Sequence, residues 1–169
     1  MRLIMFSKML KESTPAELIA LAKTWGLGGY DLCVRPGYPV NPDNAADELP
    51  RVARMFRNQG LDIPMVTGNF DLLEPDHPTA EPILHAMDKA DIRLLKLGYF
   101  MYNPAEHDYI AEVERIRSIF CRWENLASIH GVKICYHTHS NKCMGLNAAA
   151  MAHLLHGFDP ELVGAYIDP

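Results

Sequence analysis

Two histidines that stand one residue apart could carry chemistry. His137 and His139 follow the apolar run Val132–Tyr136, and positions two apart on a strand point to the same side of a sheet. Cys135, His137 and His139 are therefore expected to share one face. Imidazoles arranged in this way can ligate a metal ion or transfer protons. They can equally hydrogen-bond to neighbours in a loop, and their spacing leaves both options open.

An aspartate ends another short apolar run. Asp168 shares its side of the run with Tyr166 and Gly164. A carboxylate in this position can ligate a hard metal ion, or it can cap the helix that follows a strand. The position alone favours neither role.

A lysine interrupts a leucine-rich run. Lys96 stands in the segment Leu94-Leu95-Lys96-Leu97. A lysine in a central strand needs a partner or a cavity, because an unpaired buried charge is costly. We predict that Lys96 points into a cavity and contacts substrate; the alternative is an outward side chain that extends between helices to solvent.

Charged residues also flank Cys33. Asp31, Cys33 and Arg35 are two apart and so share one side of their run. Asp31 and Arg35 could pair with one another, or Arg35 could face an anionic substrate. The spacing allows either arrangement, and Asp31 and Arg35 are both candidates for substrate binding.

These side chains require a scaffold in which short apolar runs alternate with helix-forming segments. Six strands are expected at residues 3–6, 30–34, 63–67, 92–97, 132–136 and 162–167, and five helices at 16–23, 45–58, 80–89, 105–129 and 146–155. Such an alternation indicates βαβ units and a parallel sheet.

Two parallel architectures compete. An open doubly wound sheet carries a glycine-rich phosphate turn after its first strand, whereas Ser7-Lys8-Met9-Leu10 stands there. In a (β/α)8 TIM barrel, polar residues gather at the C-terminal ends of many strands. The candidate residues described above follow that pattern, so we predict an α/β fold of the barrel type.

The chain is shorter than a typical barrel. Its 169 residues supply about six βα units, whereas a complete barrel has eight units and about 250 residues. We therefore expect residues 1–169 to form a single TIM-barrel domain that is incomplete at its C-terminal end. A six-stranded sheet completed by a partner is the alternative.

Composition narrows the expected partners and location. The net charge of −5 argues against a dedicated nucleic-acid binder, and no apolar run approaches the roughly 18 residues of a membrane span. Four cysteines without a Cys-x-x-Cys pair fit reduced thiols, and Cys33 and Cys135 are expected in the core. We expect a cytoplasmic protein that binds neither nucleic acid nor membrane.

Four segments, in the same order, resemble the sugar phosphate isomerase/epimerase family, the xylose isomerase-like TIM barrels. They are Gly28-Gly29-Tyr30-Asp31-Leu32-Cys33-Val34-Arg35-Pro36-Gly37, Ile63-Pro64-Met65-Val66-Thr67, Tyr136-His137-Thr138-His139-Ser140 and Val163-Gly164-Ala165-Tyr166-Ile167-Asp168. The likeness covers essentially the whole chain. Tyr38-Pro39 departs from it, since close relatives tend to have Gly-His there.

The resemblance implies a divalent metal, Mn, Mg or Zn, at the C-terminal mouth of the barrel. Asp168 matches the ligand on the sixth strand, and His137 and His139 fall where many members have a Glu and a His. His137 in place of that Glu argues against isomerase chemistry that uses two glutamates. The implied reaction is metal-assisted proton transfer next to the carbonyl of a sugar or sugar phosphate, with Lys96 and His137 as catalytic residues.

We thus predict an isomerase or epimerase of carbohydrate metabolism that is weakly active or inactive without the last two strands. Open first and sixth strand edges favour association, so we expect a homo-oligomer. Two alternatives stay open: an abasic-site nuclease similar to endonuclease IV, and a non-enzymatic interaction module built on a partial barrel.

Overall fold

The computed structural model describes residues 2–168 and contains one parallel sheet. Its strands are β1 (Ile4–Phe6), β2 (Gly29–Cys33), β3 (Asp62–Thr67), β4 (Leu94–Lys96), β5 (Lys133–His137) and β6 (Val163–Tyr166). They are ordered β1-β2-β3-β4-β5-β6, with every neighbouring pair parallel. Such sequential order is that of a barrel and not of a doubly wound sheet, whose strand order reverses.

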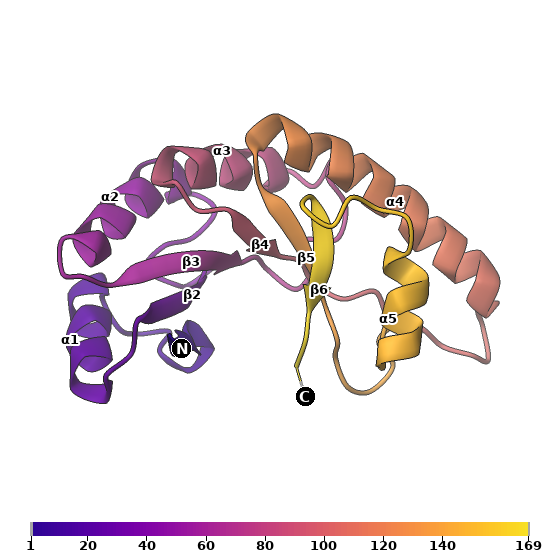
Figure 1. Ribbon diagram of the computed structural model, residues 1–169, viewed down its shortest axis with the longest axis horizontal. Helices are drawn as coiled ribbons and strands as arrows, with labels where there is room; N and C mark the ends of the chain where they lie inside the picture. The colour runs from indigo at the N-terminus through magenta and orange to yellow at the C-terminus, as the bar shows by residue number, and fades with distance from the viewer. Residues whose placement is uncertain (1, 169) are drawn as a thin grey trace.

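The helices form an outer layer around the strands. They are a short 3-10 helix η1 (Ser7–Met9) and the α-helices α1 (Pro15–Trp25), α2 (Ala45–Arg57), α3 (Ala80–Ala90), α4 (Tyr109–His130) and α5 (Ala148–Leu155). In Figure 1 the helices α1 to α4 follow the outer rim of an arch, and the strands lie inside it. The predicted partial TIM barrel is confirmed, and β1 and β6 are the two edge strands.

Local sequence explains where the helices begin and end. Thr14 and Glu17 form a capping box at the start of α1, which satisfies two backbone N–H groups at that end. Gly131 ends α4 in a left-handed conformation. This helix begins at Tyr109 and not at the predicted residue 105, because the Asp108 side chain accepts a hydrogen bond from the Ala111 N–H, 2.8 Å long, and so caps it there.

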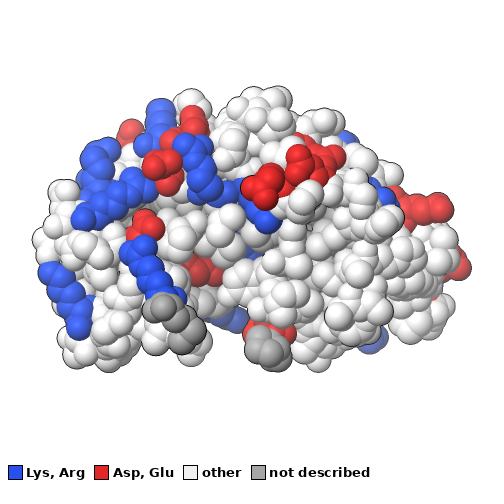
Figure 2. All heavy atoms as spheres, viewed as in Figure 1, with Lys and Arg blue, Asp and Glu red and all other residues white. Residues whose placement is uncertain are grey.

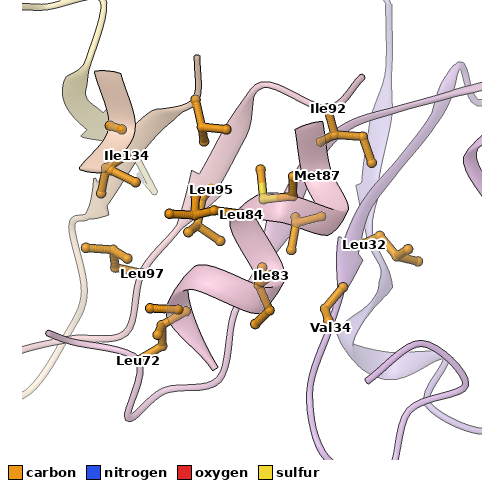
Figure 3. Packing of buried hydrophobic residues seen from close by; sticks show 14 of the residues in the cluster. Leu32, Val34, Leu72, Ile83, Leu84, Met87, Ile92, Leu95, Leu97 and Ile134 are labelled. Atoms are coloured by element: carbon orange, nitrogen blue, oxygen red, sulfur yellow. The ribbon is translucent and has the colours of Figure 1, made fainter. Parts of the chain in front are cut away.

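The core lies between the sheet and the helices. Figure 3 shows the α3 side chains of Ile83, Leu84 and Met87 between Leu32 of β2 and Leu95 of β4. These five side chains are at most 4% exposed, and each buried aliphatic side chain of this size contributes about 1.5–3 kcal/mol. This layer holds the strand ends in a fixed relation to one another.

One glycine of the family-like segments has a steric role. Gly29 has a φ of +147°, and a Cβ on it would lie 1.8 Å from the Asp62 carbonyl oxygen. The register between β2 and β3 shifts between Gly29 and Asp31. Glycine therefore allows the close approach of β3 at the start of β2, and Asp31 follows two residues later in the middle of the strand.

Several arginines form ion pairs on the surface of the outer layer. Arg51 bonds to Glu48 within α2, and Arg93 bonds to Asp88 and Asp91 next to α3. Figure 2 shows Lys and Arg side chains gathered with Asp and Glu side chains among them on the side of the molecule where α2 lies. None of the helices within residues 2–168 has the length and apolar character to cross a membrane.

Candidate functional site

The predicted site residues come from the middle of β2 and the segment after it, and from the C-terminal ends of β4, β5 and β6. Asp31, Lys96 and His137 are buried, with 5%, 3% and 3% of their surfaces exposed. Arg35 is half-buried, and the Asp168 side chain is 62% exposed. The site therefore consists of an enclosed part and a part that faces solvent.

Lys96 points inward and occupies a cage of two aromatic rings. Its Nζ lies 4.6 Å from the centre of the Phe6 ring on β1 and 4.7 Å from that of Tyr166 on β6. Burial lowers the pKa of the Lys96 ammonium, and the nearby Asp31 carboxylate opposes this shift. The predicted inward orientation is confirmed, and ring faces at this distance stabilise the cation.

Asp31 keeps one oxygen free in the interior. The Thr67 hydroxyl donates a 2.6 Å hydrogen bond to Asp31 Oδ1, whereas the buried Oδ2 has no hydrogen-bond partner within residues 2–168. Burial raises the pKa of Asp31 to about 6, against the opposing effects of Thr67, Lys96 and Arg35. A buried, unpartnered carboxyl oxygen is costly, and a substrate hydroxyl could supply the missing hydrogen bond.

Arg35 is held apart from Asp31. Its Nε donates a 2.7 Å hydrogen bond to the Gly68 carbonyl, and its guanidinium lies 5.8 Å from the centre of the Phe6 ring. In the part of the chain that the structure describes, no ion pair joins Arg35 to Asp31. The two residues do not pair with one another, and contact of Arg35 with an anionic substrate stays a prediction.

His137 and Asp168 form a pair across β5 and the end of β6. His137 Nε2 lies 3.1 Å from Asp168 Oδ2, and Thr138 fixes the aspartate because its hydroxyl oxygen accepts a 2.8 Å hydrogen bond from the Asp168 N–H. Burial lowers the pKa of His137 to about 4, and the Lys96 charge adds to this effect. The imidazole is therefore neutral near pH 7, and its buried Nδ1 has no partner among the described residues.

His139 lies near this pair but makes its polar contacts elsewhere. Its ring centre is 5.2 Å from that of His137 and 4.1 Å from that of Tyr99. Its Nδ1 lies 3.2 Å from the Ser140 carbonyl oxygen and 3.7 Å from Cys143 Sγ. The structure thus joins His137 to Asp168 and directs His139 toward the loop that follows β5.

The donor chemistry fits a divalent metal only in part. An imidazole nitrogen and a carboxylate oxygen are appropriate ligands for Mn or Zn. Among residues 2–168, however, no group of three His, Cys, Asp or Glu side chains is arranged to hold a metal ion. The ligand set His137, His139 and Asp168 stays a prediction, of which the structure brings two members into contact.

Comparison with known proteins identifies the architecture. Similar solved structures include a xylose isomerase-like protein from Rhodospirillum rubrum (TM-score 0.76, 17% identity), a D-tagatose 3-epimerase-like protein (0.74, 15%) and D-psicose 3-epimerase from Clostridium cellulolyticum (0.73, 15%). Each comparison covers 99% of this chain and 66%, 65% and 63% of the other. The fold is that of the xylose isomerase-like barrels.

This chain spans about two thirds of the length of these xylose isomerase-like barrels. The fold assignment rests on structure, because no protein-family model and no curated protein sequence matches the chain. At identities of 12–17% the likeness establishes the fold alone. The site residues must therefore be argued from their own geometry.

Several residues of the site were not among the predicted site residues. Phe6 and Tyr166 form the cage of Lys96, Thr67 bonds to Asp31, and Tyr99 stacks on His139. Thr67 carried a usable signal, since it is a polar residue at the C-terminal end of a strand. Nothing in the sequence indicated the cage, because its two rings come from the first and the sixth strand.

Proposed function

We propose that this chain serves an isomerase or epimerase reaction that moves a proton next to the carbonyl of a sugar or sugar phosphate. The observation that carries the proposal is the enclosed Asp31–Lys96 interior, which lies beside the neutral His137 imidazole at the C-terminal mouth. The fold neighbours described as xylose isomerase-like proteins and sugar epimerases support the substrate class.

Asp31, Lys96 and Arg35 bind and orient the sugar in this proposal. The free Oδ2 of Asp31 accepts a hydrogen bond from a sugar hydroxyl. The Lys96 ammonium faces the carbonyl oxygen and stabilises the negative charge that develops there when the neighbouring C–H bond breaks. Arg35 stands at the rim, where it can meet a phosphate group or a further hydroxyl.

His137 transfers the proton. Because burial lowers its pKa to about 4, the ring is uncharged at neutral pH and can accept a proton. When Nε2 carries the proton and donates a hydrogen bond to Asp168, Nδ1 keeps a free lone pair. The C–H electron pair forms a C=C bond to the carbonyl carbon while the C=O pair moves to oxygen, which gives an enediolate. In isomerisation the imidazolium returns the proton to the neighbouring carbon and the hydroxyl proton passes to the former carbonyl oxygen; in epimerisation an acid on the opposite face protonates the same carbon instead.

A divalent metal, Mn, Mg or Zn, belongs to the proposal through the His137–Asp168 pair. When bound, it would polarise the sugar carbonyl, with His137, His139 and Asp168 as its ligands in this chain. An imidazole nitrogen that ligates a metal does not act as a free base, so His137 serves as ligand in one version of the mechanism and as base in the other.

The test is exchange of the α-hydrogen of a ketose for deuterium in ²H₂O, followed by NMR. D-fructose, D-tagatose and D-psicose form the first panel, each with Mn²⁺ and with a chelator. We expect little exchange by the 169-residue chain. Much faster exchange is expected in a version that carries the two further βα units of a complete barrel.

Two substitutions in the extended version test the assigned residues. Lys96→Met and His137→Gln are each expected to reduce exchange by at least about 100-fold, with the circular dichroism spectrum unchanged. Met9→Leu, on an 82% exposed side chain, is the control. Equal exchange by the short and long versions, or exchange that survives both substitutions, would overturn the proposal.

A further inference from the structure

Two sulfur atoms and one imidazole nitrogen lie close together where the segment after β4 pairs with the segment after β5. Cys143 Sγ lies 3.8 Å from Met101 Sδ and 3.7 Å from His139 Nδ1. We propose that Met101, Cys143 and His139 form a binding site for Cu(I). This inference goes beyond the proposed sugar chemistry and does not depend on it.

The two donor distances measured from Cys143 Sγ fit a three-coordinate ion. Sulfur and imidazole ligands bind first-row metals at about 2.0–2.3 Å, so trigonal coordination separates neighbouring donors by about 3.5–4 Å. Both distances from Cys143 Sγ lie in this interval. A cation could therefore bind beside the sulfur of Cys143, between the thioether and the imidazole, with small side-chain adjustments.

The donor set selects the kind of metal. A thiolate with a thioether is a soft combination that favours Cu(I), whereas Mg, Ca and Mn prefer oxygen ligands. The site shares His139 with the predicted divalent site, so this imidazole can ligate only one of the two ions at a time, and the thioether is the donor that distinguishes the Cu(I) site. The cluster contains a methionine and so is not one of the groups of His, Cys, Asp and Glu considered above.

The backbone holds the two loops in register. Met101 and Cys143 form an isolated antiparallel bridge, and the neighbouring hydrogen bonds are 2.6 Å from the Tyr102 N–H to the Lys142 carbonyl and 2.9 Å from the Met144 N–H to the Phe100 carbonyl. Two of the three donors are thus positioned by paired backbone segments, and not by flexible side chains alone.

The third donor is oriented by the loop after β5. Asn141 has a φ of +64°, a left-handed conformation that asparagine tolerates better than most residues. Tyr99 packs against the His139 ring at 4.1 Å. With its proton on Nε2, the ring presents the Nδ1 lone pair toward Cys143; in the other tautomer Nδ1 donates to the Ser140 carbonyl, 3.2 Å away.

An ion can reach the site from solvent, and its binding requires the release of one proton and no electron transfer. Met101 is 57% exposed, whereas Cys143 is 5% exposed. The Cys143 thiol releases its proton to solvent as the Cu–S bond forms, and copper enters and stays as Cu(I), so no electron is transferred. One sulfur faces solvent and the other is enclosed, which lets the thioether receive the ion before the thiolate binds it.

The chain supplies matched controls for each sulfur ligand. Cys121 is an exposed free thiol, and Met9 is an 82% exposed thioether, and neither contributes a donor to the cluster. The comparisons are therefore Cys143→Ser against Cys121→Ser, and Met101→Leu against Met9→Leu. Because Met101 lies mostly at the surface, its substitution is expected to leave the fold intact even if Cys143→Ser does not.

The experiment is competition for Cu(I) presented as its bicinchoninate complex, under anaerobic conditions with reductant. We expect one equivalent bound by the unmodified protein, at least about tenfold weaker binding by Met101→Leu and a larger loss in Cys143→Ser, and no change in either control. Binding of Zn²⁺ is expected to be insensitive to Met101→Leu. Equal Cu(I) affinity of Met101→Leu and Met9→Leu, or an affinity that follows Cys121 instead of Cys143, would overturn the proposal.

Discussion

The site residues of β2 to β4 and those of β5 to β6 differ in whether their buried groups are charged. In the first region Asp31 and Lys96 lie enclosed, and the aspartate retains a buried oxygen without a partner in residues 2–168. In the second region His137 is buried and uncharged, and its partner Asp168 is mostly exposed. The interior of the barrel thus contains a charged region around Asp31 and Lys96 and a neutral region around His137.

The two regions therefore respond to acid in opposite directions. The folded pKa of Asp31, about 6, lies above its ordinary value of 3.8, so ionisation of Asp31 opposes folding as the pH rises. The folded pKa of His137, about 4, lies below its ordinary value of 6.5, so protonation of His137 opposes folding as the pH falls. Between pH 4 and 6 the two effects largely cancel.

Asp31→Asn is expected to produce the largest change. The amide keeps an oxygen that accepts from Thr67 but removes the buried charge, so the free energy of unfolding at pH 8 should rise by about 3 kcal/mol. At pH 4, where Asp31 is protonated in the folded protein, the gain should be small. Urea unfolding at both pH values measures the difference, and a variant that is less stable at pH 8 would break the comparison.

His137→Phe isolates the opposite response. The unmodified protein should lose up to about 3 kcal/mol through His137 as the pH falls from 6.5 to 4, and the phenylalanine variant should lack this loss. The slope of stability against pH is the measured quantity, because a packing change shifts all pH values equally. An unchanged slope would show that His137 is protonated without cost, and hence solvated in the folded state.

Tyr136→Phe tests how firmly the second region is supported. The fully buried Tyr136 hydroxyl accepts a hydrogen bond from the Phe100 N–H (3.2 Å) and donates one to the Met144 carbonyl (3.0 Å). Loss of both should lower the free energy of unfolding by about 2 kcal/mol. Tyr38→Phe, which removes a 2.8 Å hydrogen bond to the Lys8 carbonyl at an exposed position, is the control and should cost less.

Asp168→Asn is expected to have the smallest effect. Its carboxylate is 62% exposed, and exposed pairs contribute less than about 1 kcal/mol. The same Asp→Asn change thus raises stability by about 3 kcal/mol in one region and hardly alters it in the other. A loss above 2 kcal/mol at Asp168, on the same urea unfolding scale, would show that the exposed pair supports the fold.

Most of the architecture could be predicted from the sequence because its signals are local. Short apolar runs that alternate with helix-forming segments indicated all six strands and five helices to within a few residues. The start of α4 was predicted wrongly at residue 105. The helix begins at Tyr109, because the Asp108 side chain caps it there. The strand order followed from the absence of a phosphate turn and the position of polar residues at strand ends.

The site could be predicted residue by residue but not as a set of contacts. The position of Lys96 among leucines indicated that its side chain needs an interior cavity or partner, and the structure confirms the inward orientation. Spacing could not indicate that Arg35 bonds to Gly68, or that Cys143 returns to His139, because such contacts depend on loop paths. Those paths are set by packing between segments distant in the sequence.

The cage around Lys96 has a consequence for folding. Phe6 and Tyr166 belong to the first and last strands, so the ammonium contacts both ends of the sheet. Contacts between such distant segments form only after the intervening chain has been ordered, which makes them slow to form. We expect the two edge strands to open together in amide hydrogen exchange. When either strand opens, the Lys96 ammonium loses one of its two rings, and its contact with the other strand is weakened as well. A single lysine thereby links the kinetic stability of β1 to that of β6.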